Sequence, residues 1–538
     1  MAGGARQVTR RSALGKGRVA RGYGALALVF GFCAMALAAI LSLGAPGLAE
    51  ASVSGLWPIL RFTLVQAFLS TLISVGLAIP AAFALDQAGP FPGRSVIITL
   101  FGLPLSLPAL AGAFGILALL GRNGWLAHAL ESVGFTIRPN LYGLSGVLIA
   151  HVFFNFPLCA RLFLNALGTI PATDWKLAAS LRMSALNRFQ FLCLPVLRAN
   201  LPGMCGLVFL LCMTSFTLVL VLGGGPNAAT LEVAIYQSLT YDFDLPRGAA
   251  LTLIQIALAG AVLAALAYAG LQSEMTGGAR SRWTPKLEAG EKALAAFIIA
   301  ISVMCVAAPF AAIIADGVRA SHPSILSSER FLLALTNSLL IASVSATAAV
   351  SASLALAAAA YAAERSGSAA RGAFQLVPNL LLAFPPIVLG AGWFILLMRG
   401  GSVDSSAMLL VIAINSVMAM PFALRILSPA FTAAAGRNDR LCEALRISGI
   451  NRLRLIDFPA MRRPLVTALL FAMALSLGDF GAIALFGSDE LVTLPSLLFA
   501  KLGSYRTDDA AGIALYLTLL SMLLAAAANG LQKERADD

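Results

Sequence analysis

The stretch "EALRISGINRLRLIDFPAMRRP", residues 443–464, is a basic amphipathic segment that occurs once more in similar form, as "AASLRMSALNRFQFLCLPVLRANLP" at residues 178–202. A constant shift of 264 positions, the separation of Pro195 and Pro459, brings the two copies into register. The shift pairs leucine with leucine and arginine with arginine outside the prolines as well, as in Leu177 with Leu441 and Arg188 with Arg452. A repeat of this length predicts two homologous halves, which lie the same way up if each has an even number of spans.

The composition around these segments is that of a membrane protein. Of 538 residues, 59% are hydrophobic and 12% are charged, which is far from the composition of a soluble domain. Apolar runs of about 20 residues cross a bilayer as helices. We therefore predict an all-α integral membrane protein with about twelve transmembrane helices in two homologous six-helix halves, with spans near residues 24–45, 60–85, 95–120, 141–166, 200–223, 248–271, 293–315, 331–361, 374–398, 407–428, 464–486 and 510–531.

These spans divide the chain into a basic N-terminal tail (1–23), a first half (24–271), a polar linker (272–292) and a second half (293–532). The net charge of +12 comes from arginines and lysines in short segments beside the apolar runs. The positive-inside rule accounts for them by topology rather than by nucleic-acid binding. We expect a multi-pass protein of the bacterial inner membrane with both termini, the linker and both basic loops in the cytoplasm.

Each basic loop is predicted to begin as a short helix, over residues 175–183 and 439–447. Leu177 and Leu181 share one face of the first helix because they are four residues apart, as do Leu441 and Leu445 in the second copy. A turn at the following serine then leads to a second segment that ends at the proline. Such helices lie on anionic lipid or in a groove of another protein, and two copies in register favour a symmetric partner.

The two loops resemble the EAA loops of permeases in binding-protein-dependent ABC importers, whose pattern is E-A-A, three residues, G, nine residues and I-x-L-P. Leu194-Pro195 and Phe458-Pro459 match the closing dipeptide. The pattern's Gly falls on Arg182 and Arg446, and its Glu on Lys176 and Arg440, so both copies depart from it. The resemblance implies the type I permease fold, with coupling loops at 168–199 and 429–463. The ATPase-coupling residues that it implies are Lys176, Leu177, Leu181, Arg182, Ser184, Asn187, Arg188, Arg440, Leu441, Glu443, Leu445, Arg446, Ser448, Gly449, Asn451 and Arg452.

Two EAA loops in one chain are similar to the fused permeases for thiamine and for ferric iron. Three stretches look like the thiamine importers in particular: "VLGGGPNAATLEVAIYQSLTYDFD" (221–244), "SLGDFGAIALFG" (476–487) and "TLPSLLFAKLGSYRTDDAAGIAL" (493–515). This resemblance implies a channel that takes thiamine or its phosphates from a periplasmic binding protein and works with two copies of an ABC ATPase subunit, in contact with membrane lipid. A ferric-iron importer permease and a proton-coupled secondary transporter are the alternatives.

The chain itself is expected to be a transport subunit and not an enzyme. It contains no G-x-x-x-x-G-K-[ST] motif, so ATP and Mg are expected to be used by the partner ATPase, with no cofactor on this chain. The three histidines have no metal-ligand spacing, and we expect no metal site.

Asp479 is the most informative acid because it lies in an apolar run that should be in or beside the bilayer, where a carboxylate is costly. With Phe480 and the equivalent Ser215 and Phe216, it is predicted to line the substrate path and to meet the cationic thiazolium ring of thiamine. The alternatives for Asp479 are a salt bridge to an internal arginine and a position at the water interface.

Three acids are predicted to lie outside the membrane, Glu232, Asp242 and Asp244, where they would dock basic residues of a binding protein. The alternative is that they are ordinary solvated acids of a loop.

Overall fold

The computed structural model describes residues 2–50, 53–135, 140–225, 228–268, 287–366, 374, 381, 384–400, 403–445, 447 and 449–537, and these contain helices but no strand. The helices of the first half are α1 (Ala2–Glu50), α2 (Val53–Gln87), α3 (Arg94–Leu100), η1 (Leu103–Ser106), α4 (Ala109–Leu120), α5 (Trp125–Ser132), α6 (Leu144–Leu167), α7 (Ala172–Ser180), α8 (Ala185–Arg188), η2 (Phe189–Cys193), α9 (Leu194–Met213), α10 (Thr217–Leu222), α11 (Leu231–Thr240) and α12 (Leu245–Tyr268). Those of the second half are α13 (Ala289–Arg319), α14 (His322–Leu326), α15 (Glu329–Ser366), α17 (Pro386–Gly400), α18 (Val403–Ala444), α19 (Gly449–Arg452), η4 (Leu453–Asp457), α20 (Phe458–Ala460), α21 (Arg462–Gly478), α22 (Gly481–Phe486), α23 (Leu494–Gly503) and α24 (Thr507–Asp537).

The all-helical membrane fold is confirmed. Within the described ranges, ten helices are long and apolar enough to cross a membrane, and an eleventh span results if the bent pair Arg454–Ala460 and Arg462–Gly478 is counted as one. Of the remaining predicted span, 374–398, residues 375–380, 382 and 383 lie outside the described residues, and most of its described part belongs to α17, which has 15 residues. Residues 272–286 of the expected linker also lie outside the described residues, whereas its last four belong to α13.

Three of the predicted spans are not continuous helices. The stretch 95–120 is divided into α3, η1 and α4, because Gly102, Pro104 and Pro108 interrupt the helical hydrogen bonds. The stretch 200–223 breaks between α9 and α10, and 464–486 breaks between α21 and α22. These last two breaks coincide under the shift of 264 positions, so the repeat extends to the interruptions of its helices.

The first helix of each half packs against the opposite half. Helix α1 of the first half contacts α15 and α17 of the second half, and helix α13 of the second half contacts α2 and α4 of the first half. Each of these two interfaces includes a glycine at a point of close contact. A Cβ atom on Gly392 of α17 would lie 2.5 Å from the carbonyl oxygen of Ala36 in α1, and one on Gly115 of α4 would lie 2.7 Å from that of Pro309 in α13. The backbones approach this closely because glycine has no side chain.

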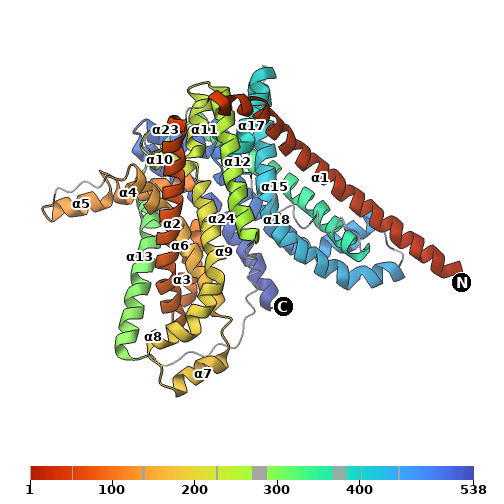
Figure 1. The fold of residues 1–538 in the computed structure, drawn as a ribbon, viewed down its shortest axis with the longest axis horizontal. Helices are drawn as coiled ribbons and strands as arrows, with labels where there is room; N and C mark the ends of the chain where they lie inside the picture. The colour runs from red at the N-terminus through yellow and green to blue at the C-terminus, as the bar shows by residue number, and fades with distance from the viewer. Residues whose placement is uncertain are drawn as a thin grey trace.

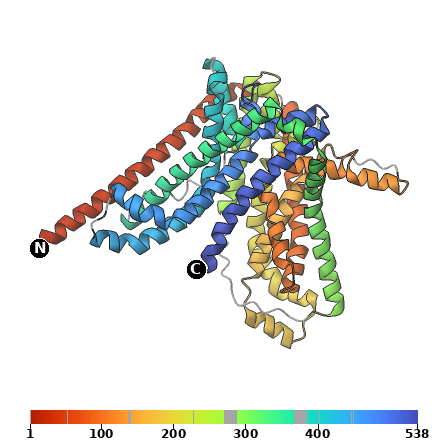
Figure 2. The same cartoon turned by 180° about the vertical axis from the view of Figure 1, so that it is seen from behind.

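Two helical bundles diverge toward one end of the molecule (Figures 1 and 2): α2, α6 and α9 lie with α13 in one, and α15 and α18 lie with α1 in the other. At the other end α10, α11, α17 and α23 gather close together, whereas α7 and α8 lie at the tip of the diverging end. Both chain termini also point away from the gathered end. We refer to the end that carries α7 and α8 as the coupling end.

Candidate functional site: the coupling loops and the central cavity

The first coupling loop forms the predicted short helix, α7. Helix α6 ends at Gly168, and α7 begins after Pro171, which cannot donate a backbone hydrogen bond. Leu177 and Leu181 present their side chains to solvent, with 60% and 66% of each residue exposed. Such a pair of exposed leucines at the tip of a membrane protein is suited to bury apolar area against a partner.

Arg182 occupies the position of the pattern's glycine and adopts the backbone conformation that favours glycine, with φ of 51°. The N–H of Met183 donates to the carbonyl of Ala178 at 3.0 Å, which closes the end of α7 in the manner of a left-handed helix terminus. The loop therefore keeps the geometry of the glycine position although its residue differs, and the arginine holds a strained conformation that costs about 1 kcal/mol.

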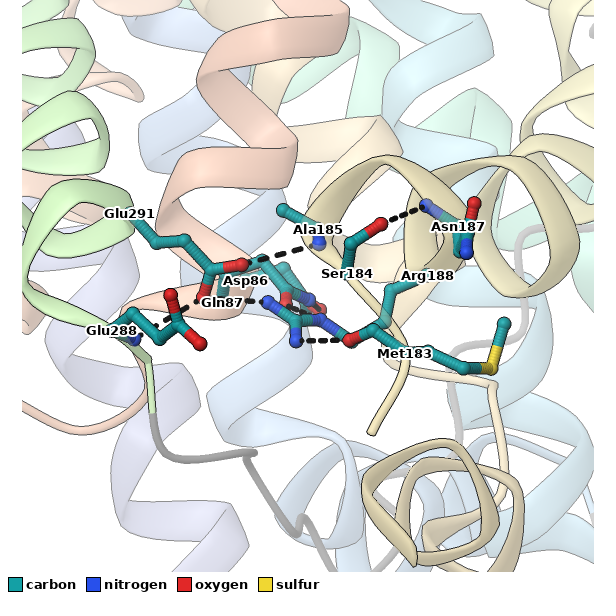
Figure 3. A network of polar contacts seen from close by, with 9 residues as sticks. All are labelled: Asp86, Gln87, Met183, Ser184, Ala185, Asn187, Arg188, Glu288 and Glu291. Carbon is teal, nitrogen blue, oxygen red and sulfur yellow. Dashed lines mark hydrogen bonds and ion pairs between the residues drawn. The ribbon is translucent and has the colours of Figure 1, made fainter. Parts of the chain in front are cut away.

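The predicted turn at Ser184 is present, since the Ser184 hydroxyl accepts from the Asn187 N–H at 3.3 Å and caps α8. Lys176 and Asn187 are exposed. Arg188 is buried, so the expectation that its side chain faces an ATPase is wrong. Only 7% of its side chain is exposed, because the guanidinium points inward and donates to three partners (Figure 3), namely Gln87 Oε1 at 3.1 Å, the Met183 carbonyl at 2.9 Å and Glu291 Oε2 at 2.9 Å.

Glu291 is a site residue that reasoning from the sequence missed. It lies 103 positions after Arg188, at the end of the polar linker predicted at 272–292. The available signal was the spacing of Glu288 and Glu291, which form a capping box at the start of α13. That signal predicts where the helix begins but not which element its carboxylate will touch.

The second coupling loop differs from the prediction of a separate helix at 439–447, which is wrong. Helix α18 continues without a break to Ala444, because the positions equivalent to Gly168 and Pro171 are Thr432 and Ala435, which do not end a helix. Leu441 and Leu445 are nevertheless exposed, at 53% and 59%.

The other residues of this loop are only partly described. Arg446 and Ser448 lie outside the described residues, as do the side chains of Arg440 and Glu443 and the exposure of Gly449. Asn451 is exposed. Arg452, like its equivalent Arg188, faces inward, and it pairs with Asp439 and Asp457.

A cavity of about 930 Å³ lies between the halves, and two of the residues predicted to line the substrate path are in its wall. Asp479 and Phe480 line it, together with Thr214 and Thr217 from the equivalent break in the first half. Arg425 of α18 lines it too, so the wall carries both signs of charge. The cavity is therefore built where α9 and α21 are interrupted and expose polar atoms.

Phe216 and Phe480, which occupy equivalent positions in the two halves, stack on each other with ring centroids 6.1 Å apart and planes 19° apart. Tyr236 of α11 extends the row on one side at 5.3 Å, and Phe499 of α23 extends it on the other at 5.0 Å. These four rings form an aromatic row across the interface. Ser215 is half-buried beside the row and, like Phe216, is not among the residues that line the cavity.

The Asp479 carboxylate accepts the N–H groups of Gly481 at 3.3 Å and Ala482 at 3.2 Å, and so caps α22. Within the described part of the chain, no arginine or lysine forms an ion pair with it. The geometry thus favours a carboxylate held by backbone donors on the cavity wall over the alternative of an internal salt bridge.

The three predicted docking acids differ in exposure. The expectation that Glu232 docks a binding protein is wrong, because α11 turns its first residues into the core and Glu232 is 1% exposed. Its carboxylate accepts a hydrogen bond from Gln255 Nε2 at 3.4 Å. Asp244 accepts the Arg247 N–H at 3.0 Å in the first turn of α12 and is half-buried. Asp242 is exposed and lies 3.8 Å from the Arg247 guanidinium. One of the three acids is thus open to a partner.

Comparison with known proteins finds one matching family and several similar permeases. Residues 355–533 match the family described as binding-protein-dependent transport system inner membrane component. The thiamine transport system permease protein of Brucella abortus is 48% identical over 87% of this chain and 86% of its own length. That of Escherichia coli K12 is 40% identical over 96% and 97%.

The chain belongs to the family of thiamine transport system permease proteins. The similarity to these permeases covers both halves, so it includes both coupling loops and both walls of the cavity. Membership of this permease family indicates a multi-pass inner-membrane transport subunit that works with an ATPase and a binding protein.

Proposed function

We propose that this chain is the membrane channel of a thiamine importer, which passes thiamine or its phosphates from a periplasmic binding protein to the cytoplasm. The observation that supports it best is the cavity between the halves, whose wall combines the Asp479 carboxylate with the Phe480 ring. Thiamine carries a permanent positive charge on an aromatic ring, and a carboxylate beside an aromatic face is suited to such a cation.

In this proposal the aromatic row of Phe216, Phe480, Tyr236 and Phe499 closes the cavity on the periplasmic side. The row lies at the breaks that precede α10 and α22, and its stacked pair joins equivalent positions of the two halves. Separation of the halves at this end would part the stacked rings and open the path. Ser215 contributes to the path from behind the row.

The coupling end is assigned to the cytoplasm together with both termini, in agreement with the arginines of both loops. Two copies of an ABC ATPase bind there, one at Leu177 and Leu181 and the other at Leu441 and Leu445. ATP and Mg are used by these subunits, and this chain binds no cofactor. The opposite end faces the periplasm and receives the binding protein, with Asp242 as its exposed acid.

Uptake of labelled thiamine tests the proposal in four strains, with this chain present or deleted and with the ATPase subunit present or deleted. Loss of uptake in each single deletion is the expected result. Uptake that persists without this chain refutes the thiamine assignment, and labelled ferric iron is then the substrate to test. Uptake that needs this chain but not the ATPase, and that an uncoupler abolishes, identifies a proton-coupled transporter instead.

A further inference from the structure

The Glu291 carboxylate joins the start of two helices that belong to different halves (Figure 3). Its Oε1 accepts the N–H of Ala185, the first residue of α8, at 3.1 Å. Its Oε2 accepts the N–H of Glu288, which precedes α13, at 3.3 Å, and the guanidinium of Arg188 at 2.9 Å. One carboxylate therefore caps a helix of the first coupling loop and the first helix of the second half.

The same guanidinium also reaches the end of α2 through Gln87, the last residue of that helix. Arg188 is enclosed, and 22% of the Glu291 side chain is exposed, so water competes little for these charges. Charge-assisted hydrogen bonds of this kind are short and hold their partners in a fixed geometry. We call the contacts among Arg188, Gln87 and Glu291 the cross-half brace.

Among its described residues, the second coupling loop shows no equivalent of this brace. Arg452 binds Asp439 and Asp457, both of its own half, and the Asp439 carboxylate also accepts from the Tyr361 hydroxyl of α15 at 2.8 Å. The counterpart of α13 in the first half is α1, and the sequence contains no Asp or Glu before Glu50. The first helix of the first half thus has no carboxylate to offer Arg452 at its start.

We propose that the cross-half brace makes the first coupling loop move together with both α2 and α13, so that an ATP-driven displacement of this loop reaches both halves at once. Helix α13 contacts α2, α4 and α24, which gives the displacement a route into the second half. The second coupling loop, by contrast, moves with α15 and α18 of its own half. The two loops are therefore unequal transmitters, and Glu291 is a positioning residue for transport. This inference rests on the proposed function, because it assumes an ATPase at the coupling loops.

Distance measurement between two spin labels tests the brace directly. Labels go on cysteines at the exposed positions Gln190 and Lys292, on either side of the brace, with the exposed Cys305 replaced by serine. The permease is measured alone and in complex with the ATPase, with and without a non-hydrolysable ATP analogue. We expect one narrow distance distribution that nucleotide does not change. E291Q should broaden it and make it change with nucleotide, because the neutral amide no longer pairs with Arg188.

E288Q is the matched control, since Glu288 has the same charge in the same capping box but its side chain accepts from the backbone of α13. It should leave the distribution narrow. If E291Q cannot be purified, R188K provides the same test, because lysine keeps the charge and loses the forked donors. If the distance distribution of E291Q or R188K is as narrow as that of the parent protein, the brace is overturned. This comparison is valid in the permease alone as well as in the complex with the ATPase.

Transport in proteoliposomes gives the functional reading, as thiamine moved per ATP hydrolysed. We expect E291Q to lower this ratio about tenfold and E288Q to change it less than about twofold, since E291Q leaves the enclosed Arg188 guanidinium without the Glu291 carboxylate. An unchanged ratio in E291Q overturns the coupling role. A parent protein that moves no thiamine refutes the proposed function instead, and the spin-label distances still decide whether the brace exists.

Discussion

Truncation of Leu177 and Leu181 to alanine should weaken ATPase binding at the first coupling loop, and the size of the effect follows from their exposure. These residues are 60% and 66% exposed, so a partner can bury about two thirds of each. Full burial of a leucine side chain is worth about 1.5–3 kcal/mol, which gives about 1–2 kcal/mol for each residue and about 2–4 kcal/mol for the pair. The dissociation constant should rise by roughly 30- to 1,000-fold.

The assay is titration of the purified permease in detergent with labelled ATPase subunit. Leu28 on α1 is 78% exposed, and α1 lies apart from α7 (Figure 1), so L28A is a control in which one exposed leucine outside the loop is truncated. The alanine pair at Leu441 and Leu445 should weaken binding by a similar factor at the second loop. A dissociation constant for the Leu177 and Leu181 variant that matches that of L28A would refute the assignment of this face to the ATPase.

Three further changes probe other parts of the molecule. D479N should reduce thiamine uptake about tenfold or more while the complex still assembles. The amide can accept an N–H of α22 but cannot balance the charge of a cation. Uptake at the parent rate would show that Asp479 is not part of the substrate path. R182G should raise the free energy of unfolding by about 1 kcal/mol, seen as a higher Tm, since glycine adopts φ of 51° without strain; a lower Tm would contradict the strain. G392V should cost about 1–3 kcal/mol through its clash with the Ala36 backbone, whereas G31V, with open space around the Cβ, should cost less than half as much in the same thermal scan.

The repeat was the part of the fold that the sequence predicted best, because two copies in one chain can be aligned with each other. The shift that pairs Pro195 with Pro459 also places Phe216 over Phe480, and these two rings stack in the structure. Equivalent positions near a pseudo-twofold axis lie close together in space. The alignment therefore carried three-dimensional information that hydropathy alone does not contain.

The errors of prediction have local causes. A separate second coupling helix was expected from symmetry, yet Thr432 and Ala435 allow α18 to continue where Gly168 and Pro171 interrupt the first copy. Comparison of those four positions would have shown the difference. The burial of Glu232 could not be seen in the same way, because an acid between apolar residues of a short helix has the same sequence pattern whether it faces solvent or core.

The position of Asp479 gives a physical reason for a charge on the wall of a channel. A carboxylate that pairs with an arginine would have to exchange that partner for each substrate cation, whereas an isolated one would be too costly to hold in the membrane. Two N–H groups of α22 stabilise this carboxylate and leave it as an acceptor on the cavity wall, as the proposed transport role requires. Those hydrogen bonds spread its negative charge and so limit how tightly it binds a cation. A transport site needs this compromise, because a substrate that binds too tightly at the midpoint of its path is not released. The break between α21 and α22, which sequence hydropathy treats as one span, is what makes both backbone donors available.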